Sequence, residues 1–449
     1  MRLAWFSPWT PQASGVAGIS TVVVDKLASS GHAIDIFVDD RAVATGRSSA
    51  DAPQPGRVRV QSAHDFVWRQ ARGQFDLTVY QLGNSRLHHY IWPYLFQFPG
   101  LAVLHDARLH HARAGALLST QRADEYRAEF AFNHPGAARA AELAVPGFDG
   151  AYYYLWPMTP AIVAASRLTA VHTKGGAHDL SEAWPEAAIE YVALGQDPLP
   201  ALSPKERRTV RAALGFEDVD VVFGAFGALT ADKRLPQIIS AFAQVLRIAP
   251  TARLVLAGAA DPTVDLDRLA LDFGVTGAVV RCGVLDDRAF DRTIAAVDVS
   301  LNLRWPTAVE TSGPWVRAIS AGLPTVTIAL AHQAGVPALD PRDWSVTPFG
   351  ADPATIAIDI VDEDHSLGLA MRRLALDSAL RASLGLAGRR YWEAEHTVAR
   401  MVADYERVLA RALTMPAPTD ELPAHLRPDP TEHLRRTLAA VPEVSCALR

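Results

Sequence analysis

Residues 305–324, WPTAVETSGPWVRAISAGLP, read as a polar loop, a short amphipathic helix and a Gly-x-Pro turn that leads into an apolar strand. Glu310 stands beside Thr311, Ser312 and Gly313 at the start of this helix. A carboxylate can accept hydrogen bonds from sugar hydroxyls, and the free N–H groups of a helix start suit a phosphate. The segment therefore favours a site for a nucleotide sugar, with an ordinary helix cap as the alternative.

A second candidate for phosphate binding follows the apolar stretch 221–227, VVFGAFG, in the middle of the chain. The stretch reads as a buried strand that ends near Gly227, and Lys233 and Arg234 come near the start of the next helix. A cation beside free helix N–H groups can neutralise a diphosphate. Lysine occurs at only four positions in the chain, which makes it the rarer choice of cation here; a solvated surface lysine is the alternative.

Length and composition describe a globular protein of two domains. The 449 residues are 49% hydrophobic and 20% charged, and such a length usually divides between two cores. The net charge of -6, with no basic run, argues against a nucleic-acid partner. Cys282 and Cys446 form no Cys-x-x-Cys pair, and no apolar run is long enough to span a bilayer. We expect a cytoplasmic protein, with peripheral contact at the inner face of the membrane left open.

Strands and helices alternate along the chain. In the first half, strands are expected at residues 3–6, 33–38, 77–81, 101–104, 168–172 and 189–193, and a helix at 19–29. In the second half, strands are expected at 221–225, 253–257, 278–282, 299–303 and 325–330, and helices at 204–214, 235–248, 266–273, 287–295 and 314–321. This alternation predicts an α/β fold with two doubly wound parallel sheets, each covered by helices on both faces.

A Gly/Pro-rich break near residues 195–200 separates the two halves. We therefore expect a first Rossmann-like domain at 1–197 and a second at 198–388. A long amphipathic helix is expected at 389–413, and the Pro-rich, charged stretch 414–449 reads as a flexible tail.

Candidate ligand-binding residues of the first half follow its expected strands. Gly15 and Gly18 lie in the loop after the first strand, where they allow a ligand to approach the backbone closely. His105 and Asp106 directly follow the strand at 101–104, and His105 could donate to a hydroxyl or phosphate, with a structural histidine as the alternative. The pattern His-Asp-x-x-x-His-His also permits a metal site, but no further acidic or cysteine cluster completes one. The motifs of hydrolase triads, P-loop ATPases and zincins are missing from the sequence.

In their order along the chain, these motifs resemble the GT-B glycosyltransferases of family 4, a retaining group that uses nucleotide sugars. The matching segments are 11–20, 103–106, 172–174, 192–195, 226–234, 256–258, 302–307 and 310–324. The resemblance implies two Rossmann-like domains that face each other across a cleft, with the donor held mainly by the second domain and the acceptor by the first. It also implies that the helix at 389–413 crosses back to the first domain.

The resemblance implies roles for individual residues. Lys233, helped by Arg234, would hold the diphosphate, Glu310 would bind hydroxyls of the donor sugar, and His105 would lie near the reacting sugar. Gly227, Thr311, Ser312 and Gly313 would contact phosphate; Cys282, Gly283 and Val284 would meet the base; Gly15, Gly18 and Asp106 would line the acceptor side of the cleft.

Two positions depart from the family pattern, and both concern contacts to ribose or phosphate. A second glutamate is replaced by Ala318, next to Arg317, and an arginine is replaced by Ala228. The expected reaction moves a sugar from a nucleoside-diphosphate sugar, with retention and without a metal or other cofactor, to an unidentified acceptor: a glycan, a lipid-linked molecule or a small molecule. A GT-B sugar-nucleotide epimerase and a catalytically silent sugar-nucleotide-binding subunit are the alternatives.

Overall fold

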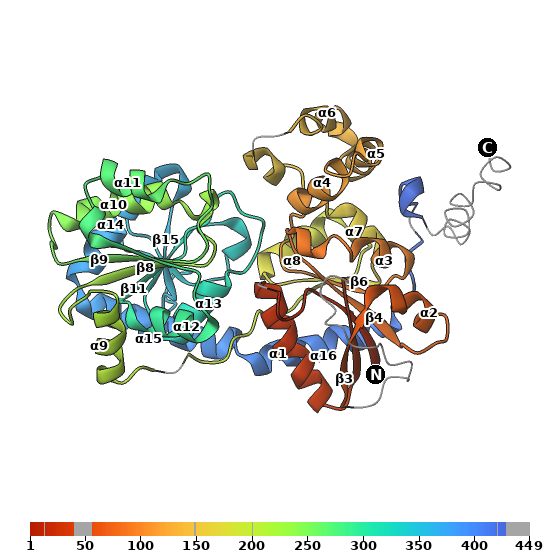
Figure 1. Ribbon diagram of the computed structural model, residues 1–449, viewed down its shortest axis with the longest axis horizontal. Coiled ribbons are helices and arrows are strands. Elements are labelled where there is room, and N and C mark those ends of the chain that lie inside the picture. The colour runs from red at the N-terminus through yellow and green to blue at the C-terminus, as the bar shows by residue number, and fades with distance from the viewer. Residues whose placement is uncertain (13, 40–55, 148–149, 200, 420, 428–449) are drawn as a thin grey trace.

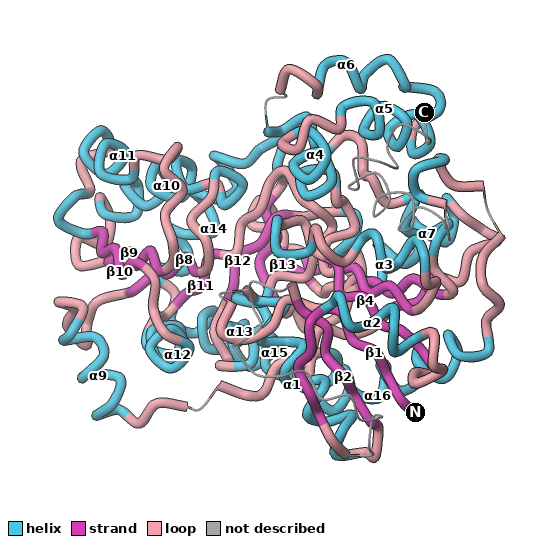
Figure 2. The backbone as a smooth tube through the Cα atoms, turned by 45° about the vertical axis from the view of Figure 1, so that its right-hand side comes forward, coloured by secondary structure: helices cyan, strands magenta, loops and turns pink. Residues whose placement is uncertain are grey.

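Two β-sheets, one in each half of the chain, form the frame of the protein (Figure 1). The computed structural model describes residues 1–12, 14–39, 56–147, 150–199, 201–419 and 421–427. Helices lie on both faces of each sheet, as the tube view of the backbone also shows (Figure 2). The expected α/β architecture with two doubly wound sheets is therefore confirmed.

Within the described residues, the first sheet has seven strands, paired in parallel in the order β3-β2-β1-β4-β5-β6-β7. The strands are β1 Arg2–Phe6, β2 Ala33–Val38, β3 Val58–Ser62, β4 Leu77–Leu82, β5 Leu101–Leu104, β6 Leu168–Val171 and β7 Ile189–Tyr191. Central strands such as β5, LAVL, are buried along their whole length, which is why they read as continuous apolar runs. Strand β3 was not predicted, because this edge strand is only partly buried and carries polar residues.

The helices of the first half are α1 Gly15–Ser29, α2 Phe66–Gln70, α3 Trp92–Gln97, α4 His110–Leu118, α5 Ala123–Asn133, α6 Ala141–Ala144, α7 Pro160–Ala165 and α8 Lys174–Ala183. Helix α1 starts before the expected residue 19, so Gly15 and Gly18 belong to its first turn and not to a loop. Helices α4 to α7 lie between β5 and β6, and α5 and α6 project above the first sheet in Figure 1. Their own small core includes Leu117, Tyr126 and Phe130.

The second sheet has eight strands in the described part of the chain, in the order β10-β9-β8-β11-β12-β15-β13-β14. They are β8 Val222–Phe226, β9 Arg253–Ala257, β10 Val279–Gly283, β11 Val299–Leu301, β12 Thr325–Ile328, β13 Ala338–Leu339, β14 Val346–Thr347 and β15 Thr355–Ile358. All pairs are parallel except β13 with β14. The helices of this half are α9 Pro204–Ala213, α10 Leu235–Leu246, α11 Leu266–Asp272, α12 Asp287–Ala296, α13 Gly313–Ser320 and α14 Glu363–Leu376.

Two helices, α15 Ser378–Glu395 and α16 Val398–Thr414, replace the single helix expected at 389–413. The chain breaks at His396, whose Nδ1 lies 2.9 Å from the Leu194 carbonyl oxygen. Helix α15 packs on α13 and β12, whereas α16 packs on α1 and on the first sheet. The return to the first domain is therefore made by α16 alone.

Part of the C-terminal stretch that was expected to be flexible packs on the first domain. Leu422 and Leu426 are buried among the side chains of that domain. The expectation of a flexible tail is therefore wrong for residues 421–427, and residues 428–449, which include Cys446, lie outside the described part. No helix in the described ranges is long and apolar enough to cross a bilayer.

Candidate functional site

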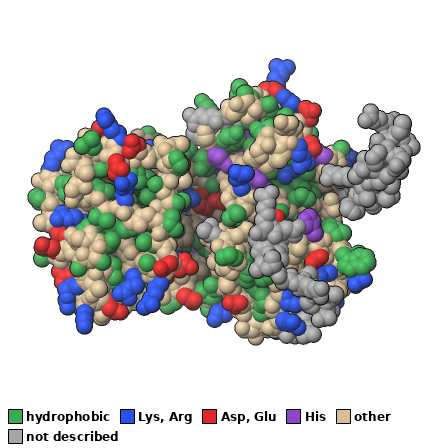
Figure 3. All heavy atoms as spheres, in the orientation of Figure 1, with side chains coloured by type: hydrophobic (Ala, Val, Ile, Leu, Met, Phe, Trp, Pro, Cys, Tyr) green, Lys and Arg blue, Asp and Glu red, His purple; other side chains and the backbone are tan. Residues whose placement is uncertain are grey.

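The loops at the carboxyl ends of the two sheets meet between the domains. The Arg108 N–H group, after β5, donates to the carbonyl of Ala308, after β11, at 3.1 Å. The Thr311 hydroxyl donates to the carbonyl of His172, after β6, at 2.6 Å. Acidic side chains show in the hollow between the two lobes (Figure 3). Parallel α/β sheets bind ligands at this edge, so the interdomain cleft is the candidate site.

Lys233 lies on the second-domain side of the cleft, with 5% of its surface exposed. Its Nζ atom donates to the Phe226 carbonyl at 3.1 Å. A Cβ atom on Gly227, which has φ +91°, would lie 3.6 Å from Lys233 Nζ and 3.4 Å from Cγ of Pro314 in the first turn of α13. The lysine, the glycine and the helix start therefore lie together, and Lys233 is not a solvated surface side chain.

The surroundings of Lys233 shift its pKa. Burial, and after it the positive charge of Arg304, lowers the pKa of Lys233 from 10.5 to about 7, against the opposing effect of Asp232 and Glu310. A buried ammonium group is stabilised when an anion comes within reach. A phosphate bound here would therefore favour the charged form of Lys233.

We predict that binding of a nucleoside diphosphate weakens as the pH rises above about 7. Unliganded Lys233 loses its proton in that range, so the ligand must bind together with a proton. The association constant, measured by calorimetry, should fall by at most about tenfold per pH unit. The unliganded fold, by contrast, gains stability from this group between pH 7 and 10.5, because there the unfolded chain holds the proton that the folded chain has lost. Lys233→Ala should remove the pH dependence of binding, and an unchanged slope would assign it to another group.

A network of ion pairs surrounds Lys233. Arg304, which comes after β11, places Nη1 2.8 Å from Glu310 Oε1 and Nε 3.5 Å from Asp232 Oδ2. Glu310 Oε2 accepts a hydrogen bond from the Thr307 hydroxyl at 3.1 Å, and its side chain is 7% exposed. The carboxylate expected to bind sugar hydroxyls is therefore held by an arginine and a threonine in this structure.

The loop before Glu310 has an unusual backbone conformation. Val309 adopts φ +61°, in the left-handed region that β-branched residues rarely enter. Its N–H group donates to Thr307 Oγ1 at 2.9 Å, and a Cβ atom on Gly176 of α8 would lie 3.1 Å from its Cγ1. The loop that carries Glu310 is thus held both from its own domain and from the first domain. Backbone strain of this kind clusters at functional sites.

Asp106 lies on the first-domain side of the cleft. Burial, and next the Glu310 carboxylate, raises the pKa of Asp106 to about 6, although the Asn84 N–H group opposes the rise by donating to Oδ2 at 2.7 Å. The loops that carry Asp106 and Glu310 are in contact across the cleft, since the Arg108 N–H group donates to the Ala308 carbonyl at 3.1 Å. Asp106 is therefore in place to contact a molecule bound there.

His105 is buried next to Asp106 and is electrically neutral. Its Nε2 lies 2.7 Å from the Gln81 side-chain oxygen, and burial together with His172 holds its pKa well below 6.5. In the tautomer that donates from Nε2 to the Gln81 oxygen, Nδ1 is an acceptor. The sequence predicted a donor at this position, so a ligand hydroxyl would have to donate to His105 rather than accept from it.

The start of α13 combines a cap with free backbone groups. The Ser312 hydroxyl accepts from the Trp315 N–H group at 3.4 Å, so the cap interpretation is correct for Ser312. Pro314, in the first turn, has no N–H group. The N–H groups of Ser312 and Gly313 precede the first turn of intrahelical bonds and remain for a ligand.

Two residues expected at the phosphate site are engaged elsewhere. Arg234 pairs with the buried Glu363 of α14, with Nε 2.8 Å from Oε1 and a second contact from Nη2. Thr311 donates its hydroxyl to the His172 carbonyl of the first domain. The structure therefore corrects both expectations: Arg234 fixes α14, and Thr311 joins the two domains.

The residues expected to meet the base lie at the end of the edge strand β10. Gly283 ends this strand with φ +63°, and Val284 after it is 76% exposed. Cys282 is half-buried, and burial raises the pKa of its thiol. These residues share the carboxyl edge of the sheet with Lys233, and their contact with a base stays a prediction.

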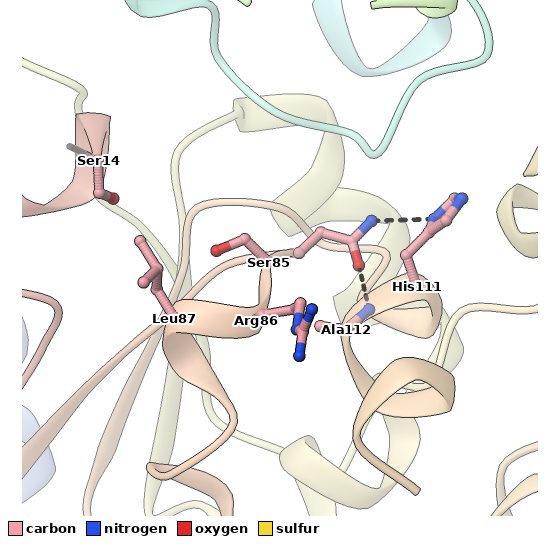
Figure 4. Close-up of a pocket in the computed structure, with 7 residues that line it drawn as sticks. Ser14, Ser85, Arg86, Leu87, His111 and Ala112 are labelled. Carbon is pink, nitrogen blue, oxygen red and sulfur yellow. Dashed lines mark hydrogen bonds between the residues drawn. The ribbon is translucent and has the colours of Figure 1, made fainter. Parts of the chain in front are cut away.

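A hollow of about 590 Å³ opens on the first-domain side of the cleft (Figure 4). It is lined by Ser14, Asn84, Ser85, Arg86, Leu87, His111 and Ala112, from the start of α1, the loop after β4 and the start of α4. Asn84 holds the rim together, since its side chain accepts from the Ala112 N–H group at 2.9 Å and contacts His111 Nδ1 at 3.2 Å. Among the described residues that line the hollow there is no carboxylate, and Arg86 is the one with a permanent charge.

Asp232, Arg304 and Thr307 are site residues that sequence reasoning missed. The signal for Arg304 was its place at the carboxyl end of an apolar strand, the same criterion that singled out His105. Despite the acidic residues of the cleft, the described ranges contain no group of three or more His, Cys, Asp or Glu residues arranged to hold a metal ion.

Comparison with known proteins places the fold. No family model matches the chain. The chain matches the crystal structure of WaaG, a glycosyltransferase of lipopolysaccharide biosynthesis, with TM-score 0.56 and 15% identity over 91% of this chain and 99% of that one. Sucrose-phosphate synthase from Thermosynechococcus elongatus gives TM-score 0.62 and 15% identity over 91% and 98% of the two chains. The chain has the GT-B fold of these glycosyltransferases, as the resemblance in sequence implied.

Two further similarities concern proteins with named ligands or substrates. HepE from Anabaena, in complex with UDP and glucose, gives TM-score 0.60 and 13% identity over 91% of this chain and 99% of that one. A curated protein from Corynebacterium glutamicum, a GDP-mannose-dependent monoacylated alpha-(1-6)-phosphatidylinositol monomannoside mannosyltransferase, is 28% identical over 193 residues. That match covers 43% of this chain and 48% of the relative, which is about half of each.

Proposed function

We propose that the protein is a glycosyltransferase that moves a sugar from a nucleotide-sugar donor to an acceptor, with retention of the anomeric configuration and without a metal ion. The observation that carries the proposal is the meeting of buried Lys233, the start of α13 and buried Glu310 at one edge of the second sheet, opposite Asp106. The GT-B fold and the curated mannosyltransferase relative support the same reaction class.

The donor diphosphate would lie over Lys233 and the N–H groups of Ser312 and Gly313. Negative charge grows on the leaving phosphate oxygen as its bond to the anomeric carbon breaks, and the ammonium and N–H groups stabilise that charge. The acceptor hydroxyl bonds to the same face of the anomeric carbon and passes its proton to the leaving diphosphate. Glu310 would orient the sugar through its hydroxyls. Retention rests on the resemblance in sequence and is tested by NMR of the product anomer.

The acceptor would enter from the first domain, through the hollow beside Arg86. Closure of two domains around a donor excludes water, which would otherwise compete with the acceptor. We place the reaction in the cytoplasm, with the acceptor either free or presented at the inner face of the membrane. GDP-mannose and UDP-glucose are the first donors to test, since the curated relative uses the former by name and HepE was solved with UDP and glucose.

Ala318, at the place of the second glutamate of the family, is fully buried in the core beneath β8. It offers no carboxylate to a ribose, so ribose contacts would come from other groups of the second domain. The site therefore has identified groups for the diphosphate and the sugar of the donor, but none that selects one particular nucleoside.

A nucleoside diphosphate should stabilise the protein in the absence of any metal ion. Lys233 and the helix N–H groups supply the positive potential that a divalent cation would otherwise provide. Ligand at about a hundred times its dissociation constant should add about 2.7 kcal/mol to the free energy of unfolding. Thermal melting with GDP or UDP, with and without EDTA, measures this, and loss of the stabilisation in EDTA would contradict the proposal.

The alternatives give different results in one assay. Release of nucleoside diphosphate with transfer to an acceptor supports the proposed activity. Conversion of the nucleotide sugar to an epimer without an acceptor would identify an epimerase. Tight nucleotide binding without turnover across glycan, lipid-linked and small-molecule acceptors would identify a silent binding subunit.

A further inference from the structure

Arg304 is a half-buried cation of the cleft, and only some of its N–H groups have hydrogen-bond partners in the described structure. Its Nη1 atom is paired with Glu310 at 2.8 Å, but its Nε atom is buried and has no hydrogen-bond partner in the described structure. Asp232 lies 3.5 Å from Nε, where it contributes charge without a well-aligned hydrogen bond. A guanidinium with a free donor in a ligand cleft is suited to a second oxygen acceptor.

The fold brings Arg304 to the same place as Lys233. Strands β8 and β11 are neighbours in the sheet, with Leu301 opposite Ala225, so the loops after them emerge side by side. The Trp305 N–H group donates to the Asp232 carbonyl at 2.7 Å and ties these two loops together. Lys233 and Arg304 therefore approach the cleft from adjacent strand ends.

Lys233 and Arg304 repel each other, and the nearby carboxylates offset that repulsion only in part. Burial first, and then the positive charge of Arg304, lowers the pKa of Lys233 and so disfavours its ammonium form. Glu310 and Asp232 offset this repulsion in part, but Glu310 is also the carboxylate best placed for a sugar. Arg304 occupies one acceptor position on Glu310 Oε1, and the Thr307 hydroxyl occupies one on Oε2. Removing Arg304 from the ion pair would free a further acceptor position for sugar hydroxyls.

We propose that Arg304 is a second phosphate-binding cation of the site and that it exchanges Glu310 for the donor diphosphate when the donor binds. The inference rests on the proposed function, since it assigns Arg304 to the donor of that reaction. The exchange releases Glu310 Oε1 toward the sugar at the moment the diphosphate arrives. Diphosphate and sugar are thus recognised in sequence by one shared ion pair.

A double-mutant cycle tests the exchange by calorimetry with GDP and UDP. Arg304→Ala should weaken binding of the nucleoside diphosphate by about tenfold to a hundredfold. Arg304→Lys keeps the charge and loses the planar fork. Its affinity should lie between those of the wild type and of Arg304→Ala. Glu310→Gln should tighten binding when Arg304 is present, because it removes the competing carboxylate, and should have no effect in the Arg304→Ala background.

Arg207→Ala is the matched control, because Arg207 of α9 has the same 30% side-chain exposure and pairs with Asp298 at 2.6 Å. It should bind as the wild type does. If both Arg304 variants bind the nucleotides with the affinity of the wild type, the role of Arg304 is overturned and the proposed function still stands. Additive effects of Arg304→Ala and Glu310→Gln would overturn the exchange. Failure of the wild type to bind either nucleotide would instead overturn the proposed function, and the inference with it.

Discussion

Replacing Lys233 by alanine should lower the rate of sugar transfer by about a hundredfold to a thousandfold, the effect of removing one charge-stabilising donor from a transition state. The ammonium group lies beside Gly227 and the start of α13, where the departing diphosphate is proposed to gather charge. The melting temperature should change little, because the folded state then no longer buries a charged group. Initial rates with a nucleotide sugar and an acceptor measure the loss.

Lys205→Ala serves as the control for this change, since Lys205 is an exposed residue of α9. It should leave transfer as in the wild type. A Lys233→Ala protein that transfers sugar at nearly the wild-type rate would remove Lys233 from the mechanism, whatever its burial.

Changing Glu310 to glutamine should lower sugar transfer by about tenfold to a hundredfold, because the charge-assisted hydrogen bonds to the sugar are weakened. Binding of the free nucleoside diphosphate should not weaken, since that ligand has no sugar. Transfer rate, nucleotide affinity and melting temperature should be measured on one preparation. A protein that loses only thermal stability would return Glu310 to a purely structural role.

Glu363→Gln is the matched control for Glu310→Gln. Both carboxylates are 7% exposed and both pair with an arginine of the same domain. The control should lose stability without a change in transfer rate per folded molecule. Equal loss of transfer in both variants would show that breaking any buried ion pair of this domain has the same effect.

The sequence predicted the sheets well because their central strands are buried on both faces. β2, β5 and β9 have the bounds that the sequence predicted, because most of their residues are apolar and buried. The partly exposed strand β3 and the short strands β13 and β14 carry no such run and were missed. The break between α15 and α16 was also missed, since the apolar periodicity continues through it. The structure shows Thr397 capping α16 by accepting from the Arg400 N–H group, and His396 Nδ1 lying 2.9 Å from the Leu194 carbonyl oxygen.

The candidate site could be predicted only where chemistry and position agreed in the sequence. Glu310, Lys233 and Gly227 stood out because each lies at a strand end or a helix start. Arg234 stood out equally well, yet its true partner is Glu363, 129 residues further along the chain. Arg304 was passed over, although it lies between Glu310 and Asp232 in space. Partners of long charged side chains are set by tertiary packing, which no local pattern records.

Val309 has a strained backbone conformation in the loop that places Glu310. A β-branched residue held at φ +61° costs about 1–3 kcal/mol, and glycine would adopt the same conformation without strain. Protein engineers who search for thermostability would therefore be drawn to this residue. The gain would come at the backbone next to Glu310, where a freer chain no longer fixes the carboxylate. We therefore expect Val309→Gly to raise the melting temperature and to loosen the placement of Glu310.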